Sequence, residues 1–235
     1  MDDSEKTGLL GIAQGGVLRA AINTGNRALV QQNGERLAGV SPALAQRLAD
    51  SLDLRLEAVV YSGAGKVFED AGRDVWDVAF LAIDATRAER VSFTRPYHTI
   101  EATYAVRSGS GISSPKDADR DGITVLSSIG SAYDFYLASA LRHARHDRIG
   151  TPTESFEAFR AGRADVVAGV RASLERFFED DPEVRILPGV LTKVEQAMVL
   201  PGRDNPQAGD LDAFVASAIE DGFVGAHVGA KPKGG

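Results

Sequence analysis

The hydrophobic positions in the first part of the chain follow two spacings, one typical of buried strands and one typical of amphipathic helices. The segments 17–22, 54–61 and 76–83 read as strands, and the last lacks the polar alternation of a half-exposed strand. A helix is predicted from Ser41 and the proline after it, and another over 64–72. This alternating order of strands and helices predicts a doubly wound α/β lobe.

The same pattern restarts after residue 100. A long strand is expected over 101–112, a strand, a glycine and serine loop and a helix over 122–141, and a helix then a strand over 155–170. One more strand, over 194–200, precedes a C-terminal amphipathic helix. The fold class that follows is α/β, with two doubly wound lobes.

No long linker separates the two lobes, so the chain is expected to cross between them within strands. We predict a discontinuous first lobe, 17–104 and 197–235, and a second lobe over 105–196. The two-strand hinge is expected near 103–107 and 195–200.

Composition narrows the function. The 235 residues are 43% hydrophobic and 25% charged, which is typical of a folded soluble protein. The net charge of −7 argues against nucleic acid, whose phosphates require an excess of clustered Lys and Arg. The chain has no Cys, which excludes disulfides and thiolate chemistry.

The sequence leaves the compartment open. The first residues are acidic and polar, without the basic and apolar regions of an export signal. Either such a signal has been removed from this sequence or the protein works in the cytoplasm. No apolar run approaches the ~20 residues of a membrane-spanning helix.

Segment 81–97, LAIDATRAERVSFTRPY, places an acid and a guanidinium where an apolar strand leaves the predicted core. Arginine suits a carboxylate ligand, because its planar fork donates two parallel hydrogen bonds and keeps its charge when water is excluded. Arg87 is therefore the candidate clamp. The spacing fits equally a surface arginine paired with Asp84 three residues earlier, and the residues alone leave both interpretations open.

A second candidate element is the segment SSIGSAYDF, in which Gly130, Ser131 and Ala132 directly precede a predicted helix. The N–H groups at the start of a helix form a natural cradle for an anion. Ser131 is also placed to cap the helix, and both roles are compatible.

Other motifs predict no cofactor and no metal. His143 and His146 lie three apart on a predicted helix, but no third ligand accompanies them, and a solvated basic face is expected there. The segment SGAGKV lacks the spacing of a phosphate-binding loop.

Together these segments resemble one family. The order AINTGN, GVSPALAQRLADSLDLRLEAV, WDVAFLAIDATRAERVSFTRPY, YAVRSGSGI, GITVLSSIGSAYDFYL and AFRAGRADVVAG is similar to the family 3 solute-binding proteins, the amino-acid-binding class of the type II periplasmic-binding-protein fold. The resemblance extends from about Val17 to near the C-terminus. It implies a monomer that closes two lobes on a small solute, delivers it to an ABC permease, and works in the periplasm.

The resemblance also implies roles for the residues above. Arg87 would clamp the carboxylate of the ligand from one lobe, and the turn at 130–132 would receive the same carboxylate from the other. The predicted ligand-binding residues of the first lobe also include Asn23 and Asn26, in the loop after the first strand. Ala82, at the end of a later strand, belongs to the same set.

Two departures from the family bear on the ligand. The strand after GRADVV commonly ends in an Asp that holds the α-amino group, and we place Gly169 at that position. We expect Asp84, at a site that often carries a Thr, to hold the cationic or hydrogen-bond-donating part of the ligand instead. Arg171 is expected either to bind a second acidic group or to cap the next helix.

We therefore expect a non-enzymatic binding protein for a small carboxylate-bearing solute, an amino acid or a similar compound. One alternative is an enzyme resembling the cyclohexadienyl dehydratases, in which Asp84, Glu101 or Glu195 would act as a general acid. Another is a ligand-sensing domain.

Overall fold

The computed structural model describes residues 8–13 and 15–230. Its strands are β1 (Val17–Asn23), β2 (Gln31–Asn33), β3 (Arg36–Ala38), β4 (Arg55–Tyr61), β5 (Val78–Ala82), β6 (Val91–Arg107), β7 (Thr124–Ser127), β8 (Arg145–Arg148), β9 (Val166–Val170), β10 (Val184–Ile186) and β11 (Thr192–Pro201). The α-helices are α2 (Val40–Ser51), α3 (Ala64–Glu69), α4 (Ala85–Ala88), α5 (Ala132–Ala140), α6 (Pro152–Arg160), α7 (Arg171–Phe177), α8 (Ala208–Glu220) and α9 (Phe223–His227). Two 3-10 turns are η1 (Leu10–Ile12) and η2 (Pro115–Ala118).

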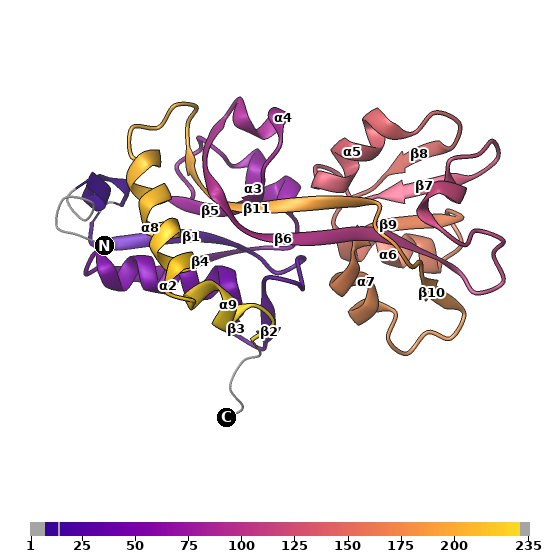
Figure 1. Ribbon diagram of the computed structural model, residues 1–235, viewed down its shortest axis with the longest axis horizontal. Helices are drawn as coiled ribbons and strands as arrows, with labels where there is room; N and C mark the ends of the chain where they lie inside the picture. The colour runs from indigo at the N-terminus through magenta and orange to yellow at the C-terminus, as the bar shows by residue number, and fades with distance from the viewer. Residues whose placement is uncertain (1–7, 14, 231–235) are drawn as a thin grey trace.

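The molecule has two halves, joined by the long strands β6 and β11 that run side by side between them (Figure 1). In the described part of the chain, nine strands form one hydrogen-bonded series in the order β4-β1-β5-β11-β6-β9-β7-β8, with β10 on β6. The pairs β1–β4, β1–β5, β7–β8 and β7–β9 are parallel, and β6 and β11 pair antiparallel with each other and with their neighbours. The fold class of two α/β lobes joined by two strands is confirmed.

The crossing strands are the predicted ones, but the crossing lies a few residues earlier in each. From Ala102 onward β6 already pairs with β9, and from Gln196 onward β11 already pairs with β5. Between these points Thr99 pairs with Glu195 and Ile100 with Val194. The lobe boundaries at 104/105 and 196/197 stay a prediction.

Strand β6 is longer than the strand predicted over 101–112, because it also includes the segment around Pro96. A proline donates no hydrogen bond, and the register of the β6–β11 pair shifts where Pro96 faces Ala197. This shift in register allows β6 to stay paired with β11 both before and after Pro96.

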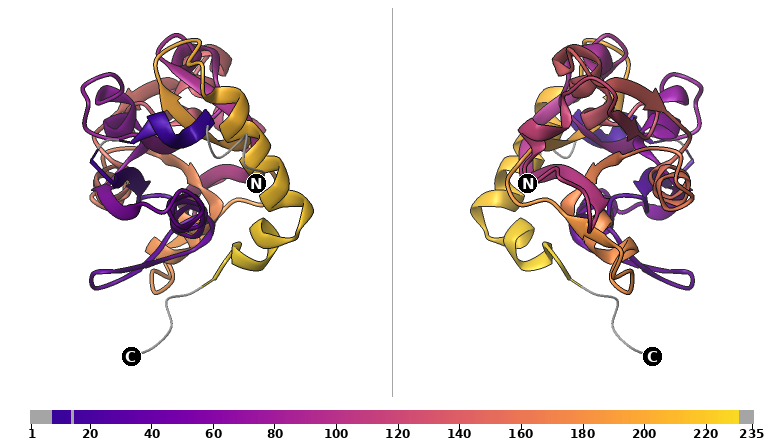
Figure 2. Two further views of the ribbon diagram at one scale, coloured as in Figure 1. Left: turned by 90° about the vertical axis from the view of Figure 1, so that its left-hand side faces the viewer. Right: turned by 90° about the vertical axis from the view of Figure 1, so that its right-hand side faces the viewer.

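The C-terminal helices return to the first half. Apolar residues of α8, including Leu211 and Phe214, join the core that holds Leu18 of β1 and Leu44 of α2. Figure 2 shows α8 and α9 on the outside of this half. No helix in residues 8–13 and 15–230 is long and apolar enough to cross a membrane.

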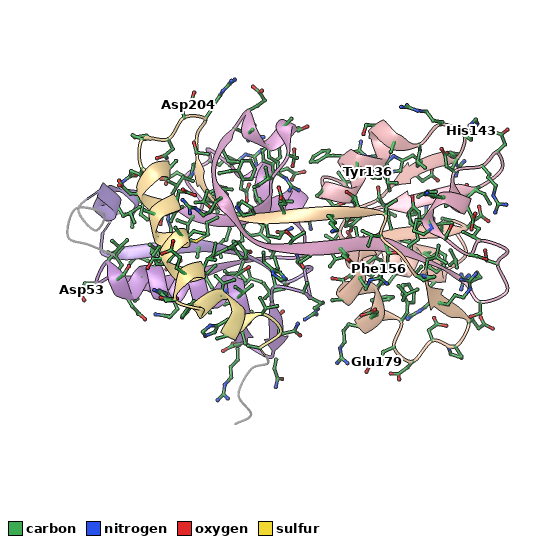
Figure 3. All side chains as sticks on the ribbon, in the orientation of Figure 1. Asp53, Tyr136, His143, Phe156, Glu179 and Asp204 are labelled. Carbon is green, nitrogen blue, oxygen red and sulfur yellow. The ribbon has the colours of Figure 1, made fainter. Side chains whose placement is uncertain are left out.

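The second half has a separate cluster of aromatic side chains under α6 and α7, including Phe156, Phe159 and Phe178. Figure 3 shows Phe156 in this interior and His143 at the outer edge of the same half. The prediction of a helix carrying His143 and His146 is wrong, because these residues lie in the turn before β8 and in β8 itself.

Candidate binding site

A small cavity of about 40 Å³ lies between the two halves. One wall comes from the ends of β1 and β5, and the other from the starts of α5 and α6 and the end of β9. Six of the residues that we predicted to bind ligand line it, namely Asn23, Asn26, Ala82, Arg87, Ser131 and Ala132. These residues come from both halves, so the cavity exists only when the halves meet.

Arg87 is fully buried at the edge of α4. Its Nη1 donates to the carbonyl of Ala82 at 3.0 Å, and its Nη2 donates to the carbonyl of Gly130, in the other half, at 2.7 Å. Its Nε lies 3.2 Å from Oδ2 of Asp84. A guanidinium has five N–H groups. These three contacts therefore leave one N–H on each terminal nitrogen, which is the pair that a carboxylate needs.

Asp84 supports Arg87 and does not line the cavity. Its Oδ1 accepts the backbone N–H of Arg87 at 2.9 Å and so caps α4. Burial lowers the pKa of Arg87 to about 10, and the carboxylate of Asp84 opposes this fall, so the guanidinium stays charged at neutral pH. The pairing expected at this spacing is present, but the arginine is not on the surface.

The turn before α5 differs from the anion cradle that we predicted. The N–H of Gly130 donates to Oδ2 of Asp134 at 2.9 Å, and the N–H of Ser131 donates to the carbonyl of Ser128. Ser131 caps α5 by accepting the N–H of Asp134 at 3.1 Å. In the described part of the chain, the N–H groups of Ala132 and Tyr133 have no hydrogen-bond partner. Of the three predicted donors, Ala132 alone stays available to an anion among the described residues, and Tyr133, which was not predicted, joins it.

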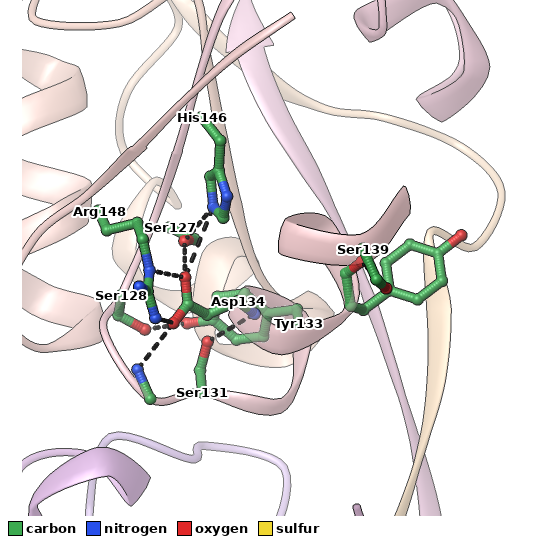
Figure 4. A network of polar contacts seen from close by, with 10 residues as sticks. Ser127, Ser128, Ser131, Tyr133, Asp134, Ser139, His146 and Arg148 are labelled. Atoms are coloured by element: carbon green, nitrogen blue, oxygen red, sulfur yellow. Dashed lines mark hydrogen bonds and ion pairs between the residues drawn. The ribbon is translucent and has the colours of Figure 1, made fainter. Parts of the chain in front are cut away.

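Asp134 is a buried carboxylate at the centre of a polar network that holds this turn (Figure 4). It accepts from Ser127 Oγ at 2.7 Å and from both Nε and Nη2 of Arg148, a residue of β8. His146 lies 2.8 Å from Ser127 Oγ through its Nε2. Burial alone would raise the pKa of Asp134, but the hydrogen bonds from Arg148, Ser127 and Gly130 outweigh it and hold the pKa below its usual value.

Sequence reasoning missed this network. Asp134 follows Ser131 at the spacing of a capped helix start, which was the one local signal of its importance. Its partner Arg148 is brought to it by the parallel pairing of β7 with β8.

Gly169 does not face the cavity, which corrects our prediction for this strand. A Cβ at Gly169 would lie 2.8 Å from the ring of Phe156 and 2.9 Å from Leu174. Since side chains alternate along a strand, the next residue, Val170, points the other way and lines the cavity. The end of β9 therefore presents an apolar side chain to the site.

Arg171 lies outside the cavity and serves the structure. Its Nη1 donates to the carbonyl of Leu187 at 3.3 Å, its Nη2 donates to that of Gly189 at 2.5 Å, and its Nε lies 3.4 Å from Glu101. These bonds fasten a loop of the second half to β6. The side chain of Arg171 does not cap α7, and the expected binding of a second acidic group stays a prediction.

Several lining residues were not predicted. Val194 and Gln196 are two apart on β11 and so share the face that meets the cavity. Ser173, on α7, also lines it. The sequence predicted a strand over 194–200, but it did not indicate which face of that strand would meet the other half.

Direct contacts hold the halves together beside the cavity. The N–H of Arg27 donates to Ser173 Oγ at 3.1 Å, and that hydroxyl donates to the carbonyl of Gly25 at 3.0 Å. A Cβ at Gly65 would lie 2.4 Å from the carbonyl oxygen of Ile129. This contact requires glycine, and it describes a closed arrangement.

We expect Gly65→Ala to hinder closure and to weaken ligand binding about tenfold or more, because overpacking costs roughly 1–3 kcal/mol. Calorimetry with the ligand that the native protein retains measures the effect. Gly209→Ala is the matched control, since no described residue lies within 4 Å of a Cβ at that position. Equal affinities of the two variants would show that the Gly65 contact does not limit closure.

The family model for the bacterial extracellular solute-binding proteins, family 3, matches residues 18–187. The chain belongs to this family. A search of curated proteins found no match. The chain has the fold of solved type II periplasmic binding proteins.

Three solved structures illustrate the likeness. The holo form of ArgBP from T. maritima is 20% identical, with a TM-score of 0.76 over 90% of this chain and 94% of that chain. A binding component of an ABC transporter from Wolinella succinogenes, complexed with lysine, has the same values. A cysteine-binding protein from Campylobacter jejuni is 21% identical, with a TM-score of 0.78 over 94% of this chain and 90% of that chain.

Proposed function

We propose that this member of the family captures a small carboxylate-bearing solute, an amino acid or an amino-acid-like compound, by closing its two halves around it. One observation carries the proposal. The buried guanidinium of Arg87 borders the cavity between the halves and retains two N–H groups without a protein partner. A carboxylate fits such a pair of donors, and exclusion of water strengthens the contact.

The role that we propose is binding without catalysis. The acids that an enzyme of the dehydratase type would use, Asp84, Glu101 and Glu195, are not among the described residues that line the cavity. Asp84 caps α4, and Glu101 contacts Arg171. No feature of the cavity favours the enzymatic or the sensing alternative.

We further propose that the protein works as a monomer outside the cytoplasmic membrane and passes its solute to an ABC permease. The family description, which refers to extracellular bacterial proteins, supports the location. Two halves that close on a ligand would give the permease a way to distinguish loaded from empty protein.

Mass spectrometry of protein purified without denaturation tests the proposal. The expected result is a retained small carboxylate, present at about one molecule per chain and absent from Arg87→Met. Calorimetry should then give the same stoichiometry. Turnover of that compound, or binding that does not depend on Arg87, would contradict the proposal.

A further inference from the structure

The described residues that line the cavity include one cationic side chain and no anionic one. Arg87 is the one charged side chain among the described residues that line it. The other polar side chains there are neutral, and the remainder of the wall is apolar, including Phe80, Val170 and Val194. A carboxylate has a cationic partner in this cavity, and an ammonium group has no anionic one.

The carboxylate of Asp84, beside Arg87, does not supply an anionic partner for an ammonium group in the cavity. Asp84 has its Oδ1 on the N–H of Arg87 and its Oδ2 beside the Nε of the same residue. The carboxylate opposes the fall in the pKa of Arg87, and Arg87 lines the cavity while Asp84 does not. An ammonium group in the cavity would lose its water, gain no ion pair and face a like charge.

The end of β9 presents no acid to the cavity. A side chain at Gly169 would meet Phe156 and Leu174, so any group that reaches the cavity from the end of β9 comes from Val170. That group is a hydrocarbon, which offers no hydrogen bond to an ammonium group.

Asn26 supplies a neutral acceptor. It lines the cavity, and its Oδ1 is buried without a hydrogen-bond partner. A buried acceptor without a donor costs free energy. A hydroxyl group or an ammonium group could each donate to it, but only the hydroxyl enters the cavity without a charge that needs an anionic partner.

The cavity also limits the size of the ligand. A buried water occupies roughly 10–15 Å³ on this scale of cavity volume. A volume of about 40 Å³ is therefore that of a few water molecules, which suits a short ligand.

We infer that the ligand is a short hydroxycarboxylate, with its carboxylate on Arg87, its hydroxyl on Asn26 and no ammonium group. This inference rests on the proposed function and makes the substrate class more specific. It differs from that proposal in excluding α-amino acids.

Four three-carbon carboxylates test it, namely lactate in both enantiomers, alanine, pyruvate and propionate. We expect calorimetry to show lactate binding at least tenfold more tightly than alanine, because an unpaired ammonium is costly to bury. Lactate should also bind more tightly than pyruvate and propionate, which lack the hydroxyl. Asn26→Leu should abolish the preference for lactate over propionate, with unfolding temperatures recorded as a check on folding.

Val170→Asp provides the converse test, since it places an acid where the structure has a hydrocarbon. Alanine should gain at least tenfold in affinity and lactate should lose affinity. Val170→Asn, which adds a polar group without charge, is the matched control and should not favour alanine to this extent.

The inference is overturned if alanine binds the native protein as tightly as lactate does, or if a panel of the common amino acids contains an Arg87-dependent ligand while no hydroxycarboxylate binds. In both cases the proposed function stands. If neither class of compound binds, the inference and the proposed function both fail.

Discussion

Arg87→Ala is expected to weaken ligand binding by about 2–5 kcal/mol, because it leaves a desolvated carboxylate without its charged partner. Arg87→Lys should also bind poorly, since an ammonium cannot supply two parallel hydrogen bonds from a planar fork. Titration calorimetry with the ligand retained by the native protein measures both losses.

Arg87→Ala also removes one of the hydrogen bonds between the halves, from Arg87 to the carbonyl of Gly130. Thermal unfolding of each variant separates a loss of folding from a loss of binding. Arg203→Ala is the matched control, because that arginine is exposed on the same half and pairs with the exposed Glu89. Native affinity in folded Arg87→Ala and Arg87→Lys would refute the clamp.

Asp134→Ala should lower the free energy of unfolding by about 2–4 kcal/mol, since the Gly130 N–H and the Ser127 hydroxyl lose a buried acceptor. Arg148 is partly exposed and can regain water, so its share is smaller. Urea unfolding measures the difference, with Asp121→Ala, at a fully solvated position, as the control.

The contribution of Asp134 should depend on pH. Its pKa is lower in the folded protein than in the unfolded chain, so the stabilisation is complete above the unfolded value and is lost as the pH falls through the folded one. The stability difference between native protein and Asp134→Asn should therefore shrink below about pH 4. A difference that is constant from pH 3 to 7 would show that Asp134 does not titrate as described.

The same network positions the start of α5, so Asp134→Ala is also expected to weaken ligand binding. Asp134 holds the N–H of Gly130, and the carbonyl of Gly130 meets Arg87.

The alternation of apolar strands and helices determined the two-lobe fold, because the burial of a strand or of a helix face follows from spacing along the chain. The residues alone left Arg87 open between a ligand clamp and a surface arginine paired with Asp84, and the resemblance to the family favoured the clamp. The chemistry of a guanidinium is readable from the sequence, but its burial beside a cavity is not.

Only the tertiary structure decided which side chains meet in the cavity. Gly169 and Val170 are neighbours in sequence, yet one faces the core and the other the cavity, because a shift of one residue in a strand reverses its faces. Likewise Asp134 and Arg148 pair only after β7 and β8 align, and the short strand β8 has no periodic signal of its own. Contacts of this kind depend on the register between distant segments, which no local pattern contains.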